Sequence, residues 1–146
     1  LMTVIGTLLV SAQAQAYTKA EERLFALNLY HEARQGGRDG MVAVGWVVLN
    51  RMKDKGFPGS IERVIRQGGP KPPCQWGWTC DRRSDEPREA RLWKLAQDVA
   101  KQMLGKSPPA DPTRGALWFH ETRLNPAYTA KLQETTRVGG NVFYRR

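Results

Sequence analysis

The sequence predicts a mainly helical α+β domain with a small β element near the C-terminus. Apolar residues recur at helical spacing in three or four segments before residue 106. Only residues 116–120 and 142–144 have the apolar and aromatic character of strands. The chain has 146 residues, which corresponds to one domain of common size, and apolar residues make up 40% of it. These values indicate one globular unit with a hydrophobic core.

The first helix is expected over residues 18–34. Thr18 is suited to the N-cap, and Glu21 follows at the position that completes a capping box. Leu24, Leu27 and Tyr30 then recur at helical spacing, and two glycines at 36–37 end the segment.

Two further helices are expected before residue 68. Residues 39–54 are apolar nearly all round, which predicts a buried helix. Ser60 is placed to cap a short helix that runs to about Gln67.

The next segment, residues 68–83, is rich in glycine, proline and tryptophan, which suits an irregular loop better than a helix or a central strand. After it, Ser84 is expected to cap a fourth helix, with Pro87 in the first turn and Gly105 past the end. Residues 106–112 form a proline-rich connection to the strands, and turns are expected at 125–126 and 139–140.

Charge and cysteine content narrow the class of protein. There are 23 Lys and Arg against 14 Asp and Glu, a net charge of +9, which favours a polyanionic partner such as nucleic acid, an anionic membrane or a cell wall. No run of about 18 apolar residues exists, so an ordinary membrane span is not expected. Cys74 and Cys80 cannot complete a four-ligand zinc site alone, and a local disulfide is expected if the chain is exported.

The N-terminal residues 1–16 resemble a signal peptide. A short apolar run at 1–10 is followed by Ser-Ala-Gln-Ala-Gln-Ala, which offers small-x-small cleavage sites, although the usual positive charge before the apolar run is missing. The alternative is a first helix of the folded domain. Export predicts that the domain comprises residues 17–146.

Glu32 is the strongest candidate for a catalytic group. It lies in the last turns of the first helix, just before the glycines, where a carboxyl at the mouth of a cleft could be half-buried. Burial disfavours the charged form, raises the pKa and suits a general acid. The alternative is a solvated glutamate paired with Arg34 or Lys19. A zinc protease motif fails, because Gln35 stands where the second histidine is needed.

Other chemistries find little support. The sequence contains neither a glycine-rich phosphate loop nor a Gly-x-Ser-x-Gly motif. Asp81 follows the cysteine loop and could face a groove. Aromatic residues gather in the second half of the chain, where they could pack in the core or stack on sugar rings or bases. Trp76 and Trp78, between the cysteines, are expected to be the most exposed of them.

Six blocks, in order along residues 22–146, resemble the cell-wall hydrolase family of spore cortex-lytic enzymes (SleB-type). The helical blocks are Tyr30-His31-Glu32-Ala33-Arg34, Gly40-x-Val42-Ala43-Val44 with Val47-Val48-Leu49-Asn50-Arg51, and Phe57-Pro58 with Val64-Ile65. The later blocks are Cys74-Gln75-Trp76 with Trp78 and Cys80-Asp81, Asp111-Pro112-Thr113-x-Gly115-Ala116-Leu117-Trp118-Phe119-His120, and Gly139-Gly140-Asn141-Val142-Phe143-Tyr144.

This resemblance implies a lysozyme-related catalytic domain that cleaves peptidoglycan at the β-1,4 bond between N-acetylmuramic acid and N-acetylglucosamine. Glu32 carries over as the catalytic residue, because it occupies the glutamate of the Glu-Ala-Arg motif. The sequence departs from the pattern at Asn141, where the family often has histidine. No metal or organic cofactor is implied. We expect no spore-specific binding domain, so a role in germination is not implied, and a vegetative wall enzyme or a phage or prophage lysis protein is an equally good expectation.

The expected reaction is that of a lytic transglycosylase, which can work with one carboxyl and leaves a 1,6-anhydro-muramic end. The alternative is a hydrolytic muramidase, for which Asp81 and Glu121 are the candidate second carboxylates. Candidate sugar contacts are Tyr30, Trp76, Trp78, Trp118 and His120.

Two rival functions are also considered. A non-catalytic wall-binding module would keep the basic surface and the aromatics but would not need Glu32. A nucleic-acid-binding protein needs basic residues gathered on one face, whereas here they are scattered from Lys19 to Arg146. The sequence therefore predicts an exported, monomeric enzyme whose partner is peptidoglycan and not nucleic acid, with no stable membrane span.

Overall fold

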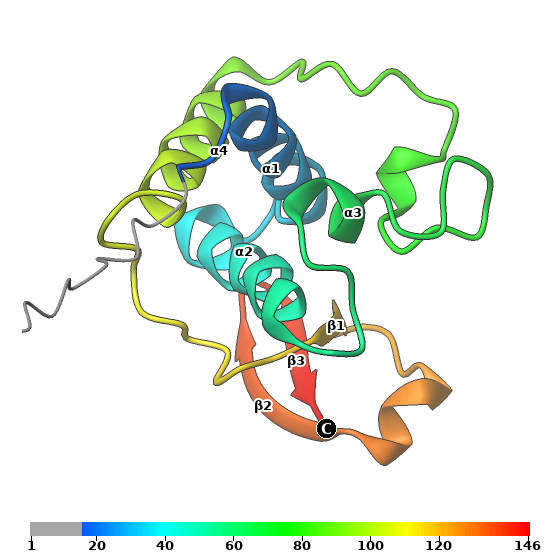
Figure 1. The fold of residues 1–146 in the computed structure, drawn as a ribbon. Helices are drawn as coiled ribbons and strands as arrows, with labels where there is room; N and C mark the ends of the chain where they lie inside the picture. Colours follow the sequence, from blue (N-terminus) through cyan, green and yellow to red (C-terminus); the bar gives the residue numbers. More distant parts are fainter. Residues whose placement is uncertain (1–15) are drawn as a thin grey trace, which may run out of the picture.

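Four α-helices make up most of the regular secondary structure of the described residues. A computed structural model describes residues 16–146, so the proposed export segment lies outside the described residues except for Ala16. The helices are α1 (Lys19–Glu32), α2 (Gly37–Lys53), α3 (Ile61–Ile65) and α4 (Ala90–Met103). Figure 1 shows α2 in the middle, with α1, α3 and α4 on one side of it and the strands on the other. The predicted mainly helical α+β fold is confirmed.

Helices α1 and α3 begin where local sequence signals place them, whereas α2 begins at Gly37, two residues before its expected start, without a side-chain cap. Thr18 and Glu21 form the predicted capping box at the start of α1, and the Ser60 side chain accepts a hydrogen bond from the Arg63 N–H at the start of α3. Helix α2 is buried along most of its length, with the side chains of Val44 and Val47 fully inaccessible. These helices enclose the hydrophobic core.

The start of the fourth helix differs from the prediction. Helix α4 begins at Ala90 with Glu89 as its N-cap, not at Ser84, whose Oγ accepts a hydrogen bond from the Glu86 N–H instead. The reason is tertiary. The Tyr30 hydroxyl accepts hydrogen bonds from the backbone N–H groups of Arg88 (3.1 Å) and Glu89 (3.2 Å), which holds this segment in a non-helical path across the end of α1.

A three-stranded antiparallel sheet follows the helices. Its strands are β1 (Trp118–Glu121), β2 (Gln133–Val138) and β3 (Asn141–Arg145), in the spatial order β1-β3-β2. Strands β1 and β3 are the two that the sequence predicted, whereas β2 was not expected. Short 3₁₀ helices, η1 (Gly77–Thr79) and η2 (Ala127–Lys131), lie in the loops. Within residues 16–146, no helix is both long and apolar enough to span a membrane.

Three glycines join the helices to the sheet. Gly139, in the β2–β3 turn, has φ +58°, and a Cβ on it would lie 2.7 Å from the Gly40 Cα and 3.1 Å from the Gly36 Cα. Only a backbone without side chains can approach this closely. The contact holds the start of β3 beside the junction of α1 and α2, and so brings two sequence-distant parts of the chain to the end of α1.

Candidate active site

Two adjoining cavities meet at the end of α1, and we describe them as the two lobes of one groove. Each lobe is a cavity of about 530 Å³. The first lobe lies between the Cys74 loop and β1, and the second lies between the α1–α2 junction and the β2–β3 turn. Glu32, Glu121 and Asn141 line both lobes. The boundary between the lobes is therefore built by one helix end and the paired ends of two strands.

Glu32 is the last residue of α1 and is only partly accessible. Burial, and secondly the negative charge of Glu121, raise the pKa of its carboxyl from an ordinary 4.5 to about 7, against the opposing effect of the Arg51 charge. Among the described residues, none forms a hydrogen bond or ion pair with this carboxyl that would hold it ionised. The group can thus exist in both protonation states near neutral pH, which is what acid–base catalysis requires.

Glu121 and Asn141 face each other across the sheet. They are directly paired in the β1–β3 register, so their side chains leave the same face of the sheet. Glu121 forms an ion pair with Arg123. Asn141 is 5% exposed, and none of the described residues forms a hydrogen bond with its side-chain amide, which borders both lobes.

Arg51, on α2, is a buried cation in the first lobe that the sequence analysis did not single out. It is 5% exposed, and its guanidinium donates to the Leu117 carbonyl oxygen (2.7 Å) and to Gln75 Oε1 (3.3 Å). It also lies 5.2 Å from the centre of the Trp76 ring. Burial lowers its pKa to about 10. The cation is therefore fixed by contacts from distant segments, which a helical sequence pattern cannot reveal.

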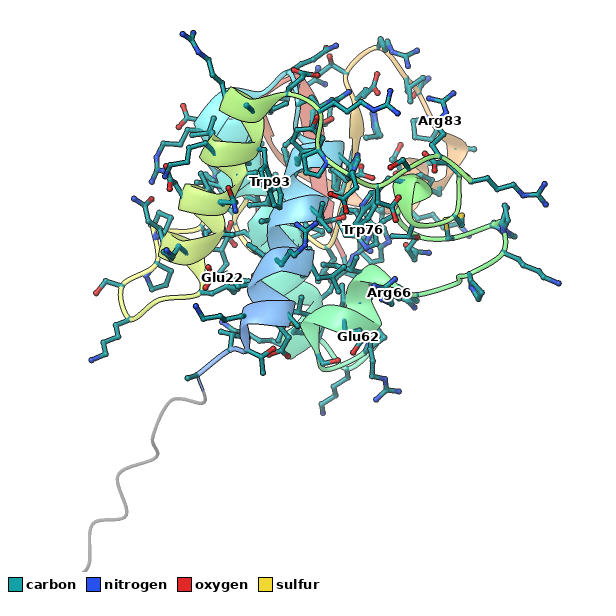
Figure 2. The ribbon with its side chains drawn as sticks, turned by 90° about the horizontal axis from the view of Figure 1, so that it is seen from above. Glu22, Glu62, Arg66, Trp76, Arg83 and Trp93 are labelled. Atoms are coloured by element: carbon teal, nitrogen blue, oxygen red, sulfur yellow. A yellow bond between two sulfur atoms is a disulfide. The ribbon has the colours of Figure 1, made fainter. Side chains whose placement is uncertain are left out.

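The two loop tryptophans are buried, so the expectation that they would be the most exposed aromatics is wrong. Trp76 is 2% exposed and donates its indole N–H to the Val64 carbonyl (3.2 Å). Trp78 is 8% exposed, donates to Asn28 Oδ1 (2.8 Å) and stacks on the His31 ring. The loop folds back over α1 and α3, and the indoles fill the space beneath it. Figure 2 places Trp76 in the interior beside these helices. Trp76 still contributes to the wall of the first lobe, but Trp78 does not line either lobe.

The other candidate sugar contacts divide in the same way. Trp118 and His120 line the first lobe, and His120 Nε2 lies 2.9 Å from the Tyr144 hydroxyl. Tyr30 is 1% exposed and does not line either lobe; its hydroxyl also accepts a hydrogen bond from Arg34 (2.7 Å). Its observed contacts hold the chain in place rather than meeting the groove.

Two exposed apolar side chains at the first lobe were not among the candidates. Leu124 is 45% exposed and Tyr128 is 51% exposed, and both line this lobe. The Tyr128 hydroxyl donates to the Phe119 carbonyl (3.2 Å), which orients the ring. Neither residue belongs to a run of apolar residues at helical or strand spacing, so the sequence pattern does not point to them. An aromatic residue in a loop is nevertheless a reason to examine that position.

The two candidate second carboxylates lie in different places. Glu121 borders both lobes together with Glu32, whereas Asp81 lines a neighbouring cavity, where its Oδ1 accepts a hydrogen bond from the Arg83 N–H. The predicted Cys74–Cys80 disulfide is confirmed, and Cys74 itself lines the first lobe. Within residues 16–146, no group of three His, Cys, Asp or Glu side chains is placed to share a metal ion.

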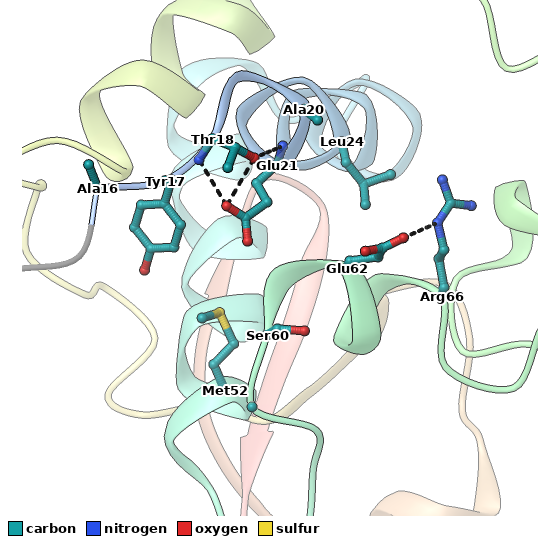
Figure 3. Close-up of a pocket in the computed structure, with 11 residues that line it drawn as sticks. Ala16, Tyr17, Thr18, Ala20, Glu21, Leu24, Met52, Ser60, Glu62 and Arg66 are labelled. Carbon is teal, nitrogen blue, oxygen red and sulfur yellow. Dashed lines mark hydrogen bonds and ion pairs between the residues drawn. The ribbon is translucent and has the colours of Figure 1, made fainter.

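A larger cavity, about 630 Å³, lies elsewhere, between the starts of α1 and α3 and the end of α2 (Figure 3). Its acidic groups are engaged in structure: Glu21 in the capping box with Thr18, and Glu62 in an ion pair with Arg66 (3.7 Å). This cavity is larger than either lobe of the groove, but Glu32, the carboxyl with the raised pKa, lines the groove and not this cavity.

Comparison with solved structures finds two catalytic domains with a similar fold. The catalytic domain of the germination-specific lytic transglycosylase SleB from Bacillus anthracis has a TM-score of 0.68 and 22% sequence identity, over 90% of this chain and 99% of that one. The catalytic domain of the Bacillus cereus SleB protein has a TM-score of 0.65 and 22% identity, over 90% and 94% of the respective chains. A comparison with curated protein sequences finds no significant match.

The family model described as Cell Wall Hydrolase matches residues 35–144. This segment covers about three quarters of the 146 residues and includes α2, α3, α4, β1, β2 and all of β3 except Arg145. It begins just after Glu32, so the role of that residue is an inference from the geometry and the resemblance of its motif. The extent of the match is sufficient to assign the family, and the chain belongs to the cell wall hydrolases.

Proposed function

We propose that this chain cleaves the β-1,4 bond between N-acetylmuramic acid and N-acetylglucosamine in peptidoglycan, as a lytic transglycosylase with Glu32 as acid and then base. The observation that carries this proposal is the position of Glu32, a carboxyl with a pKa of about 7 at the boundary of two lobes. A glycan strand laid along the groove would place sugars in both lobes and a glycosidic bond at their junction.

The reaction needs one carboxyl. Protonated Glu32 donates its proton to the glycosidic oxygen as the bond from that oxygen to C1 of the muramic residue breaks. The Glu32 carboxylate then takes the proton of the C6 hydroxyl of the same residue while O6 bonds to C1. The products are a 1,6-anhydro-muramic end and a free 4-hydroxyl on the N-acetylglucosamine. The nucleophile belongs to the substrate, which gives it a high effective concentration, and water is not consumed.

The rest of the groove supports binding of an amino sugar. Trp118 and the exposed Tyr128 ring offer aromatic surface to the C–H faces of sugar rings. Asn141, whose amide has no partner among the described residues, can donate to and accept from an N-acetyl group of the substrate. Arg51 provides fixed positive charge in the first lobe. The site combines apolar walls with a few polar groups, as carbohydrate binding requires.

Hydrolysis by water is the second candidate, because Glu121 also borders both lobes. In that reaction Glu121 would act as the second carboxylate. Asp81 is less well placed for this role, because it lines a cavity beyond the two lobes.

Mass spectrometry of the soluble products from purified peptidoglycan separates these readings. The wild type is compared with Glu32→Gln, Glu121→Gln and Asp81→Asn. Anhydro-muramic ends from the wild type and from Glu121→Gln, but not from Glu32→Gln, are the expected result. Reducing ends that require Glu121 would favour the hydrolase. Identical products from the wild type and Glu32→Gln would remove Glu32 from the mechanism.

The setting of the enzyme follows from the substrate. Peptidoglycan lies outside the cytoplasm, so we propose that the chain is exported, with residues 1–16 as the candidate export segment. The Cys74–Cys80 disulfide suits an oxidising compartment. The net charge of +9 would draw the domain to the peptide carboxylates and teichoic phosphates of cell walls. We expect the protein to be a monomer, which suits an enzyme that acts on an insoluble polymer. It could serve as a wall enzyme or as a phage or prophage lysis protein.

A further inference from the structure

We infer that the groove continues into a cationic cavity that binds the carboxylates of the peptide stems carried by the glycan. This inference rests on the proposed function and names a further part of its substrate. The cavity measures about 480 Å³ and adjoins the second lobe, because His31 and Arg34 line both. Arg83 and Arg88 lie beyond them. We call this cavity the cationic extension.

Some charged side chains of the cationic extension form ion pairs and others do not. Arg83 and Arg88 are exposed and form no ion pair with another residue in the described part of the chain. Three arginines face two carboxylates in the cavity, which leaves it with a net positive charge: Glu86 pairs with Arg23 (3.3 Å), and Asp81 forms no ion pair in the described part of the chain but accepts the Arg83 backbone N–H (2.9 Å). The guanidiniums of Arg83 and Arg88 therefore have no ion-pair partner among the described residues and are available to an anion, and Arg34, paired with Glu89, lies between the second lobe and the extension.

The extension is held in place relative to Glu32. His31 precedes Glu32 on α1, and its Nε2 lies 3.0 Å from the Asp85 carbonyl. Tyr30 accepts hydrogen bonds from the Arg88 and Glu89 N–H groups, as described above. The segment that carries Arg83 and Arg88 is therefore tied to the same helical turn that presents the carboxyl at the boundary of the lobes. Figure 2 shows Arg83 toward the outer side of the molecule, where a branch of the substrate can reach it.

Peptide stems have the chemistry that this cavity fits. In peptidoglycan a short peptide branches from each muramic residue and carries carboxylates, whereas N-acetylglucosamine carries no branch. A guanidinium binds a carboxylate through paired N–H donors, which gives both charge and direction to the contact. A stem that leaves a sugar in the second lobe can enter the extension and so fix which sugar of the alternating strand lies beside Glu32.

The test compares two substrates and three proteins. The substrates are glycan strands with intact stems and the same strands after an amidase has removed the stems. The proteins are the wild type, the double variant Arg83→Gln/Arg88→Gln, and a control, Lys55→Gln/Arg63→Gln. The control removes the same charge from exposed residues outside the groove and the extension. The readout is the ratio of kcat/KM on stem-bearing strands to kcat/KM on stem-free strands.

The wild-type ratio is expected to exceed 1 and to fall about three- to tenfold in Arg83→Gln/Arg88→Gln, since each solvent-exposed contact contributes modestly, and to stay at the wild-type value in the control. An unchanged ratio in Arg83→Gln/Arg88→Gln would overturn the inference. An equal fall in both double variants would also overturn it, because general attraction by net charge would then explain the preference. Absence of product from the wild type on both substrates would refute the proposed function itself, and the inference with it.

Discussion

Replacing Glu32 with glutamine should stabilise the protein at pH 8 and leave its stability almost unchanged at pH 4. The Glu32 carboxyl has a pKa of about 7 in the folded protein, against an ordinary 4.5. At about 1.4 kcal/mol for each pKa unit, ionising this carboxyl costs the folded state roughly 3 kcal/mol. The folded protein binds the proton more tightly than the unfolded chain does. The stability contribution of the protonated group is therefore fully present below pH 4.5 and is lost as the pH rises through 7.

Urea unfolding of wild type and Glu32→Gln at pH 4 and pH 8 measures this cost. The difference in unfolding free energy between the two proteins should grow by roughly 3 kcal/mol in favour of the variant from pH 4 to pH 8. Comparing the proteins at each pH cancels the titration of all other groups. Glu62→Gln, on the surface of α3 with its side chain 68% exposed, is the matched control and should show no such growth. A difference that stays constant between the two pH values would mean that the Glu32 pKa is ordinary, and the general-acid argument would fail.

Three other perturbations test the groove and its frame. Glu121→Gln removes a negative charge that raises the Glu32 pKa, so the loss of activity with rising pH should move to lower pH; an unchanged pH–activity profile would show that the two carboxyls do not interact. Gly139→Ala should lower the unfolding free energy by about 2–4 kcal/mol, because backbone strain at φ +58° adds to overlap of the new Cβ with the α2 backbone. The control Gly140→Ala, at φ +81° with open space around it, should lower it by only about 1–2 kcal/mol. Equal losses of stability in thermal unfolding would refute the close contact at Gly139. Cys74→Ser opens the disulfide ring and should lower the unfolding free energy by about 2 kcal/mol, measured by urea unfolding under oxidising conditions. Wild-type protein treated with reductant should be as stable as this variant.

The parts of the fold that the sequence predicts correctly depend on neighbours along the chain. The Thr18–Glu21 capping box and the Ser60 cap are contacts within one turn, so residue spacing alone identifies them. Strand β2 escapes prediction because its residues, Gln133–Val138, are mostly polar, and they become a strand through pairing with β3. Ser84 is a sound cap in isolation, but hydrogen bonds to Tyr30 from the following segment delay the helix.

The same distinction applies to the groove. Glu32 can be recognised because its own helix end and motif set it apart. Arg51 cannot, because its burial depends on Leu117 and Trp76, which approach from distant parts of the chain. Trp76 and Trp78 look exposed in a loop sequence, yet what lies beneath a loop is decided by the helices that it covers. Sequence thus identifies the chemical group more readily than its surroundings, and the surroundings set its pKa.

The contact between Gly36, Gly40 and Gly139 also bears on which strands the enzyme can accept. Here backbone meets backbone, so no side-chain rotation can widen the second lobe at this point. Its width is a property of how the sheet sits on the helices. A methyl group at position 139 would push the β2–β3 turn away from α2, and the paired residues Glu121 and Asn141 would move away from Glu32 together. Replacing one hydrogen of Gly139 with a methyl group would thus alter the spacing between Glu32 and its two neighbours without changing any of these three side chains.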